Sequence, residues 1–228
     1  VYKRQACNRA DLDGAVSIHS VERYLGDLAI EKGWTFTRPT EPSGHRVLVI
    51  GAGPAGLSAA YHLAMLGHDV EIHDAGDKVG GMMRYGIPEY RLPREILDAE
   101  VARLTDLGIK IVLNHPVNDL MEEKAKGRFD AVFVAIGAHL SKRVDIPTVD
   151  ASRMVDAVSF LHNVAAGEKP LIGRRVAVYG GGNTAMDAAR VAKRLGAEES
   201  IVVYRRTAEQ MPAHAEEREE AELSLIHI

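Results

Sequence analysis

Two glycine-rich turns, each between an apolar strand pattern and an alanine-rich helix pattern, constrain this chain most strongly. The first follows residues 47–50 and places glycine at positions 51, 53 and 56. The second follows residues 176–179, with glycine at 180–182 and alanine at 185. Such turns let a dinucleotide pyrophosphate lie against bare backbone, at the N-terminus of the next helix. We therefore expect an α/β fold with two Rossmann-like nucleotide-binding units, and electrons passed from one nucleotide to the other.

The residue that ends the second strand of the first unit indicates which nucleotide binds there. A helix pattern at Pro54–Leu66 stops at Gly67, and a strand pattern at Asp69–His73 follows it and ends at Asp74. A carboxylate in this place accepts hydrogen bonds from ribose hydroxyls and repels a 2′-phosphate. The first unit is therefore predicted to bind an unphosphorylated dinucleotide such as FAD.

The second unit repeats this arrangement with the opposite charge. Its helix pattern covers Thr184–Leu195 and its second strand Ile201–Tyr204, and the next residues are Arg205 and Arg206. Guanidinium groups suit a phosphate dianion. This unit is predicted to bind NADPH, while the alternative is a solvated basic pair at a strand end.

Composition excludes several other classes. A chain of 228 residues, 46% of them hydrophobic, can bury a core and is expected to form two domains. Its net charge of −4 predicts no nucleic-acid partner, and no apolar run is long enough to span a membrane. The single cysteine cannot form the redox pair of a flavin disulfide reductase. The ten histidines lack the close helical spacing of a zinc site, so we expect them to be surface or packing residues.

A longer motif between the two turns carries a family resemblance. Residues 80–93, together with residues 176–190 and 204–213, resemble the small (β) subunit of NADPH-dependent glutamate synthase. Similar electron-input modules occur in dihydropyrimidine dehydrogenase, in the large subunit of NADPH:ferredoxin transhydrogenases and in formate-dehydrogenase-associated subunits. The resemblance covers about residues 7 to 220.

The resemblance assigns cofactor roles to individual positions. Asp74 stands where relatives usually have the longer Glu, and the strand 131–136 is expected to close the FAD half. For Arg91 and Val117, the alternative to FAD binding is an ordinary structural role. The FAD positions are Gly51, Gly53, Pro54, Ala55, Gly56, Asp74, Gly81, Met82, Arg91 and Val117. The NADPH positions are Gly180, Gly181, Gly182, Asn183, Thr184, Arg205 and Arg206.

The N-terminal residues differ from the rest. Apolar residues recur at three- and four-residue steps from Ile18 to Leu28, which predicts one amphipathic helix, and Thr37–Gly44 is predicted to be a linker. From the residues alone, Cys7 is expected to be a buried or inert thiol. The resemblance instead makes this part the remnant of a helical [4Fe–4S] domain, with Cys7 as one cluster ligand and Glu22 as a side-chain oxygen ligand.

Three domains are expected. They are residues 1–42, the cluster-domain remnant; residues 43–170, the FAD-binding domain with a connector helix; and residues 171–228, the first part of the NADPH-binding domain. Val1–Gln5 and Leu223–Ile228 match nothing in the family and are expected to be foreign. We accordingly expect a fragment that is inactive alone and binds FAD weakly or not at all.

The resemblance implies an NADPH-dependent oxidoreductase subunit with no catalytic side chain. A hydride passes from NADPH to FAD, and single electrons then pass through [4Fe–4S] clusters to a partner catalytic subunit. That partner is the glutamate synthase large subunit, a formate dehydrogenase or a ferredoxin-type protein, in the cytoplasm. Two alternatives are a flavin monooxygenase, although no F-x-G-x-x-x-H segment occurs here, and a non-catalytic nucleotide-binding module.

Overall fold

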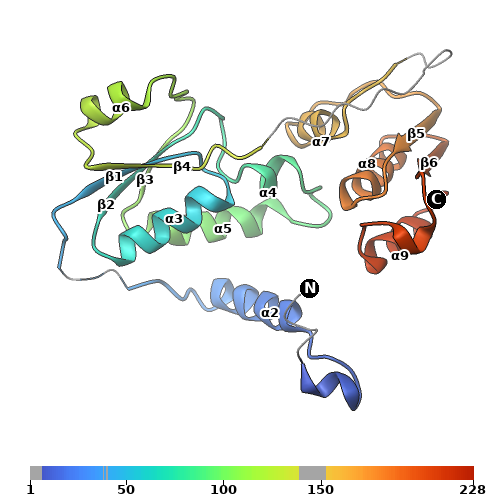
Figure 1. Ribbon diagram of the computed structural model, residues 1–228, viewed down its shortest axis with the longest axis horizontal. Coiled ribbons are helices and arrows are strands. Elements are labelled where there is room, and N and C mark those ends of the chain that lie inside the picture. Colours follow the sequence, from blue (N-terminus) through green and yellow to red (C-terminus); the bar gives the residue numbers. More distant parts are fainter. Residues whose placement is uncertain (1–6, 38, 40, 139–152) are drawn as a thin grey trace.

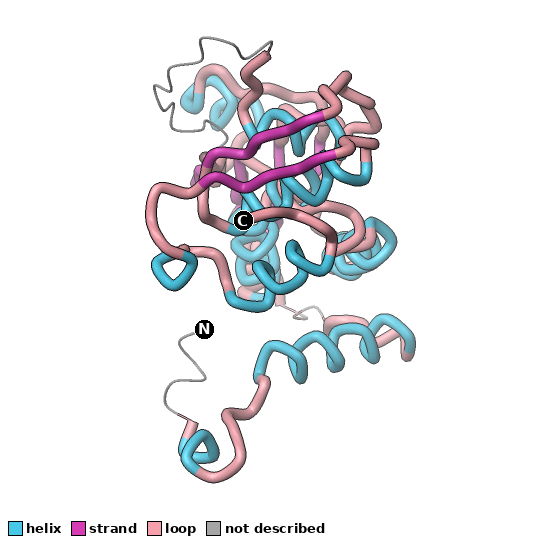
Figure 2. Tube along the Cα trace, turned by 90° about the vertical axis from the view of Figure 1, so that its right-hand side faces the viewer, coloured by secondary structure: helices cyan, strands magenta, loops and turns pink. Residues whose placement is uncertain are grey.

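Two α/β units and a separate N-terminal helix make up the described part of the chain. The structure is a computed structural model, and it describes residues 7–37, 39, 41–138 and 153–228. Figure 1 shows the larger unit, with strands β1 to β4, beside the smaller unit with β5 and β6. In Figure 2, helix α2 lies apart from both sheets.

The larger unit is built on a fully parallel sheet in the order β3-β2-β1-β4. The central strand β1 is apolar and almost entirely buried, because parallel sheets are covered on both faces. The strands are β1 (Arg46–Ile50), β2 (Asp69–His73), β3 (Lys110–Val112) and β4 (Ala131–Val134).

Helices cover this sheet unequally on its two faces. Helices α3 (Pro54–Met65) and α5 (Arg94–Thr105) lie on one face, where Val49, Val70 and Ile72 are buried in the main core. The shorter α6 (Leu120–Gly127) lies on the other face, and Figure 1 shows it opposite α3 and α5. The four-residue helix α4 (Met82–Tyr85) follows β2.

The smaller unit has two parallel strands, β5 (Arg175–Tyr179) and β6 (Glu199–Val203), joined by α8 (Asn183–Arg194). Helix α8 is the most buried helix of the described chain, because it packs against both strands and against α7 (Ala157–Ala165) and α9 (Ala215–Leu223). A 3₁₀ turn, η2 (Ala208–Gln210), links β6 to α9.

The N-terminal part contains the 3₁₀ turn η1 (Asn8–Asp11) and the predicted amphipathic helix α2 (Ile18–Glu31). Only Ala29 of α2 is buried, and α2 contacts the larger unit mainly through α5. Val21, Tyr24 and Leu25 are about half exposed or more, so the apolar face of this helix is only partly covered.

Most predicted elements agree with the structure to within a residue or two. The first strand–helix–strand unit is confirmed, while β4 ends at Val134 rather than at position 136. Residues 223–228, which are expected to be foreign, pack beside β6: the Val202 N–H donates to the His227 carbonyl at 2.7 Å, and Ile226 is buried. Val1–Gln5 lie outside the described residues.

Across the described residues, no helix is both long and apolar enough to cross a membrane.

Candidate functional site

The first glycine-rich turn joins β1 to α3 and is shaped by two close backbone approaches. Gly51 has φ +107°, and a methyl group there would lie 2.3 Å from the Ala135 carbonyl oxygen. A methyl group at Gly56 would lie 1.8 Å from the Gly51 carbonyl oxygen. Gly53 is different, because its closest neighbour would be Gly81 Cα at an ordinary 3.8 Å. The protein itself therefore requires glycine at 51 and 56, whereas Gly53 leaves space that a ligand can use.

Asp74 lies at the mouth of this turn, as the sequence predicts. The Ala52 N–H donates to Asp74 Oδ2 at 2.5 Å, and the Gly76 N–H donates to Oδ1 at 2.7 Å. A carboxylate has about four acceptor sites. Two backbone donors thus fix its orientation and leave acceptor capacity for ribose hydroxyls.

The paired glycines after β2 come against the same turn. The Gly80 N–H donates to the Ala52 carbonyl at 2.9 Å, and a methyl group at Gly81 would lie 2.8 Å from Gly53 Cα. Met82 begins α4 directly after this contact. The turn, the acidic residue and the glycine pair therefore form one cradle at the carboxyl edge of the sheet.

Val117 lies near the same edge on the other face of the sheet. It is partly buried against Leu48, Ile50 and Phe129. The loop before Val117 is hydrogen-bonded to the carboxyl edge of the sheet, because the His115 N–H donates to the Asp74 carbonyl at 2.8 Å.

Arg91 is the predicted FAD residue whose side chain contacts the other unit. Its Nη1 lies 2.7 Å from Asp187 Oδ2 on α8, and its Nη2 pairs with Glu217 on α9. The Tyr90 hydroxyl also donates to Asp187, at 3.3 Å. Burial raises the pKa of the Asp187 carboxyl, and the Arg91 guanidinium opposes that shift. In this structure Arg91 therefore ties the two units together.

The second turn, between β5 and α8, differs in how its glycines are used. A Cβ at Gly180 would lie at an ordinary 3.4 Å from the side chain of Ala185, which stands at the third position of this turn. Gly181 packs under the Tyr204 ring, which a Cβ would approach to 2.5 Å. A Cβ at Gly182 would have nothing within 4 Å. The backbone at Gly182 is therefore open to a ligand.

The segment after η2 anchors this second turn, which sequence reasoning missed. The Ala213 N–H donates to the Gly181 carbonyl at 3.0 Å, and the His214 N–H donates to Asn183 Oδ1 at 3.1 Å. Both donors lie in or beside the motif 204–213 that carried the family resemblance. The sequence therefore contained this motif, but the linear pattern could not show that it contacts the second turn.

Arg205 and Arg206 follow β6 on the same side as the second turn. Tyr179, the residue before that turn, pairs with Val203 in register. Both arginines are exposed, and neither forms a salt bridge with any residue that the structure describes. Thr184 is likewise exposed, in the first turn of α8. Two free guanidinium groups at this mouth suit an anionic ligand.

The two predicted cluster ligands lie in the N-terminal part. Hydrogen bonding from the Val16 backbone, and next from that of Arg9, lowers the pKa of the Cys7 thiol, which favours the thiolate that metals bind. Glu22 lines a cleft between α2 and residues 91–100. Neither residue belongs to a group of three potential metal ligands in the described part of the chain. Their cluster role stays a prediction.

Comparison with known proteins places this geometry in a family context. The profile described as pyridine nucleotide-disulphide oxidoreductase matches residues 45–225. The chain is 40% identical to the NADP(+)-dependent formate dehydrogenase subunit beta of Moorella thermoacetica, over 95% of this chain and 34% of that protein. It is 36% identical to the glutamate synthase [NADPH] small chain of Escherichia coli, over 93% of this chain and 48% of that one.

A solved structure supports the fold. Mycobacterium tuberculosis FprA in complex with NADPH aligns with a TM-score of 0.65 at 22% identity, covering 80% of this chain and 48% of that one. This likeness supports the arrangement of strands and helices alone. The chain thus spans about a third to a half of each of these known proteins.

Proposed function

We propose, since this chain belongs to the pyridine nucleotide-disulphide oxidoreductase family, that it is part of an NADPH-dependent electron-input flavoprotein. The observation that carries the proposal is a pair of similar turns with opposite charges at their mouths. Asp74 lies at the mouth of the first turn, and Arg205 and Arg206 are exposed beside the second. Acidic and basic residues in these places select an unphosphorylated and a 2′-phosphorylated dinucleotide respectively.

The first cradle fits FAD. Gly51 and Gly56 close the turn, Gly53 offers bare backbone to the pyrophosphate, and Asp74 has acceptor capacity for the ribose. Gly81 and Met82 would line the flavin side of the same cradle. When bound, the flavin would supply the redox chemistry by accepting a hydride from the nicotinamide and releasing electrons onward. The chain's own residues bind and orient, and none is required to move a proton.

The second cradle fits NADPH. Open backbone at Gly182 would face the pyrophosphate, above the N-terminus of α8, with Thr184 in the first helical turn. Arg205 and Arg206 would bind the 2′-phosphate. The single cysteine of the chain cannot carry the disulfide chemistry in the family's description, so we propose no thiol step.

The relatives' names indicate a partner. Formate dehydrogenase subunit beta and the glutamate synthase small chain are named as parts of larger enzymes. We propose that this protein likewise supplies electrons to a separate catalytic subunit, in the reducing cytoplasm. A [4Fe–4S] cluster takes four protein ligands, and the resemblance assigns two residues of this chain to one, Cys7 and Glu22. These two residues do not make up a complete cluster.

Nucleotide preference tests the proposal. Calorimetric titration with NADP⁺ and NAD⁺ would compare the wild type with the double variant Arg205→Glu, Arg206→Ser. Each charge-assisted hydrogen bond contributes about 1.5–3 kcal/mol, so the affinity for NADP⁺ should fall at least about tenfold while that for NAD⁺ is kept or improved.

A matched pair of arginines provides the control. Arg174 and Arg175 lie at the other end of β5 and pair with Glu198 and Glu199. The double variant Arg174→Glu, Arg175→Ser should leave NADP⁺ affinity unchanged. Equal NADP⁺ affinity in the wild type and the Arg205/Arg206 variant would contradict the assignment.

A further inference from the structure

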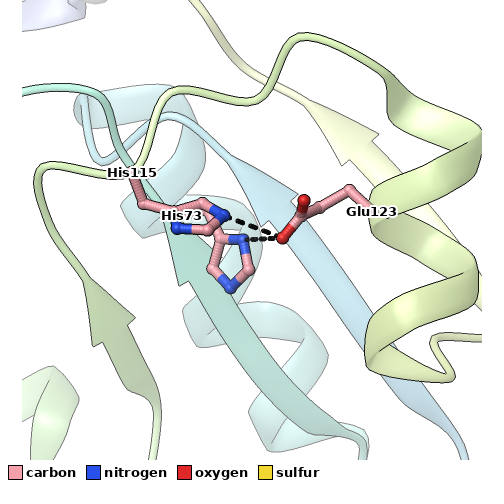
Figure 3. Close-up of side chains that lie close together, drawn as sticks. All are labelled: His73, His115 and Glu123. Atoms are coloured by element: carbon pink, nitrogen blue, oxygen red, sulfur yellow. Dashed lines mark hydrogen bonds and ion pairs between the residues drawn. The ribbon is translucent and has the colours of Figure 1, made fainter.

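Two histidines and a glutamate converge on the face of the larger sheet that α6 covers. His73 ends β2, His115 lies in the loop after β3, and Glu123 lies on α6. One ligand atom from each residue lies within 4.8 Å of the other two. Figure 3 shows both imidazole rings directed at a single carboxylate oxygen of Glu123. The sequence predicted surface or packing histidines, because the three residues come from three different elements and share no helical spacing.

The distances between these atoms are those of ligands around a small cation. Glu123 Oε1 lies 2.8 Å from His115 Nε2 and 3.1 Å from His73 Nδ1. Zinc binds nitrogen and oxygen ligands at about 2.0–2.1 Å in a tetrahedral arrangement, so its ligands stand about 3.3 Å apart. Small shifts of the partly exposed His115 and Glu123 side chains would therefore bring the three atoms to bonding distance.

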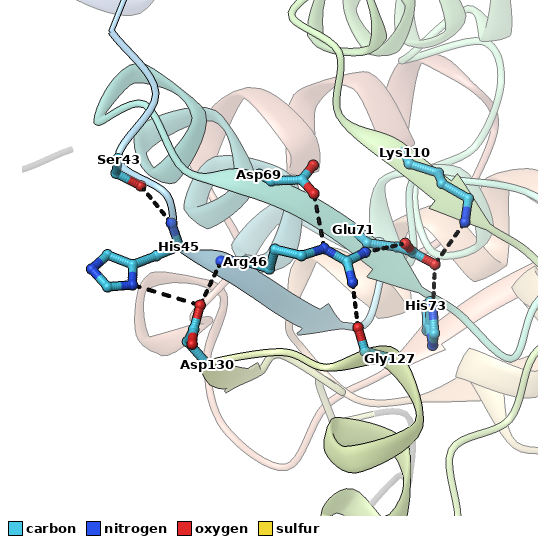
Figure 4. A network of polar contacts seen from close by, with 9 residues as sticks. All are labelled: Ser43, His45, Arg46, Asp69, Glu71, His73, Lys110, Gly127 and Asp130. Carbon is cyan, nitrogen blue, oxygen red and sulfur yellow. Dashed lines mark hydrogen bonds and ion pairs between the residues drawn. The ribbon is translucent and has the colours of Figure 1, made fainter.

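The His73 ring is oriented by a second carboxylate. Its Nε2 lies 2.9 Å from Glu71 Oε1, which also accepts from Lys110 Nζ at 3.0 Å. Figure 4 shows Glu71 held between Arg46, Lys110 and His73. A carboxylate that accepts from one ring nitrogen places the lone pair on the other, and metal-bound histidines are commonly oriented in this way. For His73 that second nitrogen is Nδ1, on the side of Glu123.

His73 Nδ1 supplies an independent observation. Its side chain is 7% exposed, and Nδ1 is a buried atom without a hydrogen-bond partner among the described residues. Buried polar atoms are almost always satisfied, so an unsatisfied one indicates a missing ion or proton. A lone pair on Nδ1 would repel a carboxylate oxygen 3.1 Å away, so the contact requires either a proton on Nδ1 or a metal ion bound to both atoms.

We propose that His73, His115 and Glu123 form a site for a divalent transition metal of the Zn²⁺ class. Two imidazoles and a carboxylate suit a borderline cation better than Mg²⁺ or Ca²⁺, which take oxygen ligands. The three protein ligands leave a fourth position for water, and the 41%-exposed side chain of His115 gives solvent a path to the site. The metal would join β2 to α6 and to the loop that carries Val117.

Zinc titration tests the site directly. The chain, in a Cys7→Ser background that removes the thiol, would be stripped with a chelator and titrated calorimetrically with ZnCl₂. One equivalent should bind tightly. Glu123→Gln and His115→Ala each remove one ligand, and each should weaken binding at least tenfold. These two residues are partly exposed, so their variants should fold even if a His73 variant does not.

A second histidine pair is the control. His45 is exposed and His68 partly exposed, with ring centroids 6.0 Å apart, and His45→Ala with His68→Ala should leave zinc binding unchanged. Zinc should also raise the melting temperature of the parent chain but not that of Glu123→Gln. Zinc affinity that is unchanged in both ligand variants overturns the proposal. The proposal is also overturned if the chain binds no zinc at micromolar concentration and nitrogen NMR shifts show that both His73 nitrogens are protonated at neutral pH.

Discussion

Replacing Gly56 by alanine tests whether the first turn is shaped by the protein or by its ligand. The added Cβ would lie 1.8 Å from the Gly51 carbonyl oxygen, and Cβ atoms in proteins essentially never come within 3.0 Å of a heavy atom from a distant part of the chain. Both partners are backbone, so α3 and β1 must separate by more than an ångström. Forced overpacking costs about 1–3 kcal/mol and occasionally more, while alanine in place of glycine in a helix returns up to about 1 kcal/mol.

The net expectation for Gly56→Ala is a loss of about 2 kcal/mol of unfolding free energy, the upper end of the overpacking cost less the helix gain. Urea unfolding followed by far-ultraviolet circular dichroism would measure it, as a lower midpoint with an unchanged slope. Gly182→Ala is the matched control, because Gly182 has φ −94° and nothing within 4 Å of its Cβ position. That variant should change stability by less than about 1 kcal/mol. A Gly56→Ala chain as stable as the wild type would refute the steric reasoning.

Two further predictions concern the contact between the units. Arg91→Ala should destabilise the chain by about 2–3 kcal/mol, because it leaves the 6%-exposed Asp187 carboxylate unpaired. The double variant Arg91→Ala, Asp187→Ala should recover part of that loss in urea unfolding, and a strictly additive result would show that the two residues do not interact. Burial and the neighbouring Asp187 raise the pKa of Tyr90 from 10.0 to about 12. Because the folded-state pKa is the higher one, the chain should lose stability as the pH rises from about 10 to 12. Tyr90→Phe should show a smaller loss over that interval, and an identical pH profile would exclude Tyr90 as the cause.

Local patterns predicted the glycine-rich units because each signal lies within one short stretch of chain. An apolar strand, a glycine turn and an alanine-rich helix follow one another, and their order leaves little freedom. Asp74 could be placed for the same reason, since it directly follows β2. Its two backbone donors, Ala52 and Gly76, were not foreseen, because a one-dimensional pattern does not give hydrogen-bond partners.

The remaining features depend on contacts between distant residues. The family resemblance assigned Arg91 to the flavin, with a scaffold role as the alternative, and its ion pairs join it to residues about a hundred positions later. Helix α6 was not predicted either, although Asp119 caps it by accepting from the Met121 and Glu122 N–H groups and could have marked its start. The His73 cluster needed the sheet to bring a strand end, a loop and a helix together.

The ion pairs of Arg91 also constrain how the two units can move. Arg91 belongs to the larger unit, while Asp187 and Glu217, its partners, belong to the smaller one. Any hinge rotation that swings the nicotinamide cradle away from the flavin cradle must therefore break these pairs or carry the 86–93 loop along with it. Asp187 lies on α8, the helix that starts at the second turn. The 86–93 loop would therefore restrain α8, and the pivot of such a rotation must lie elsewhere in the chain.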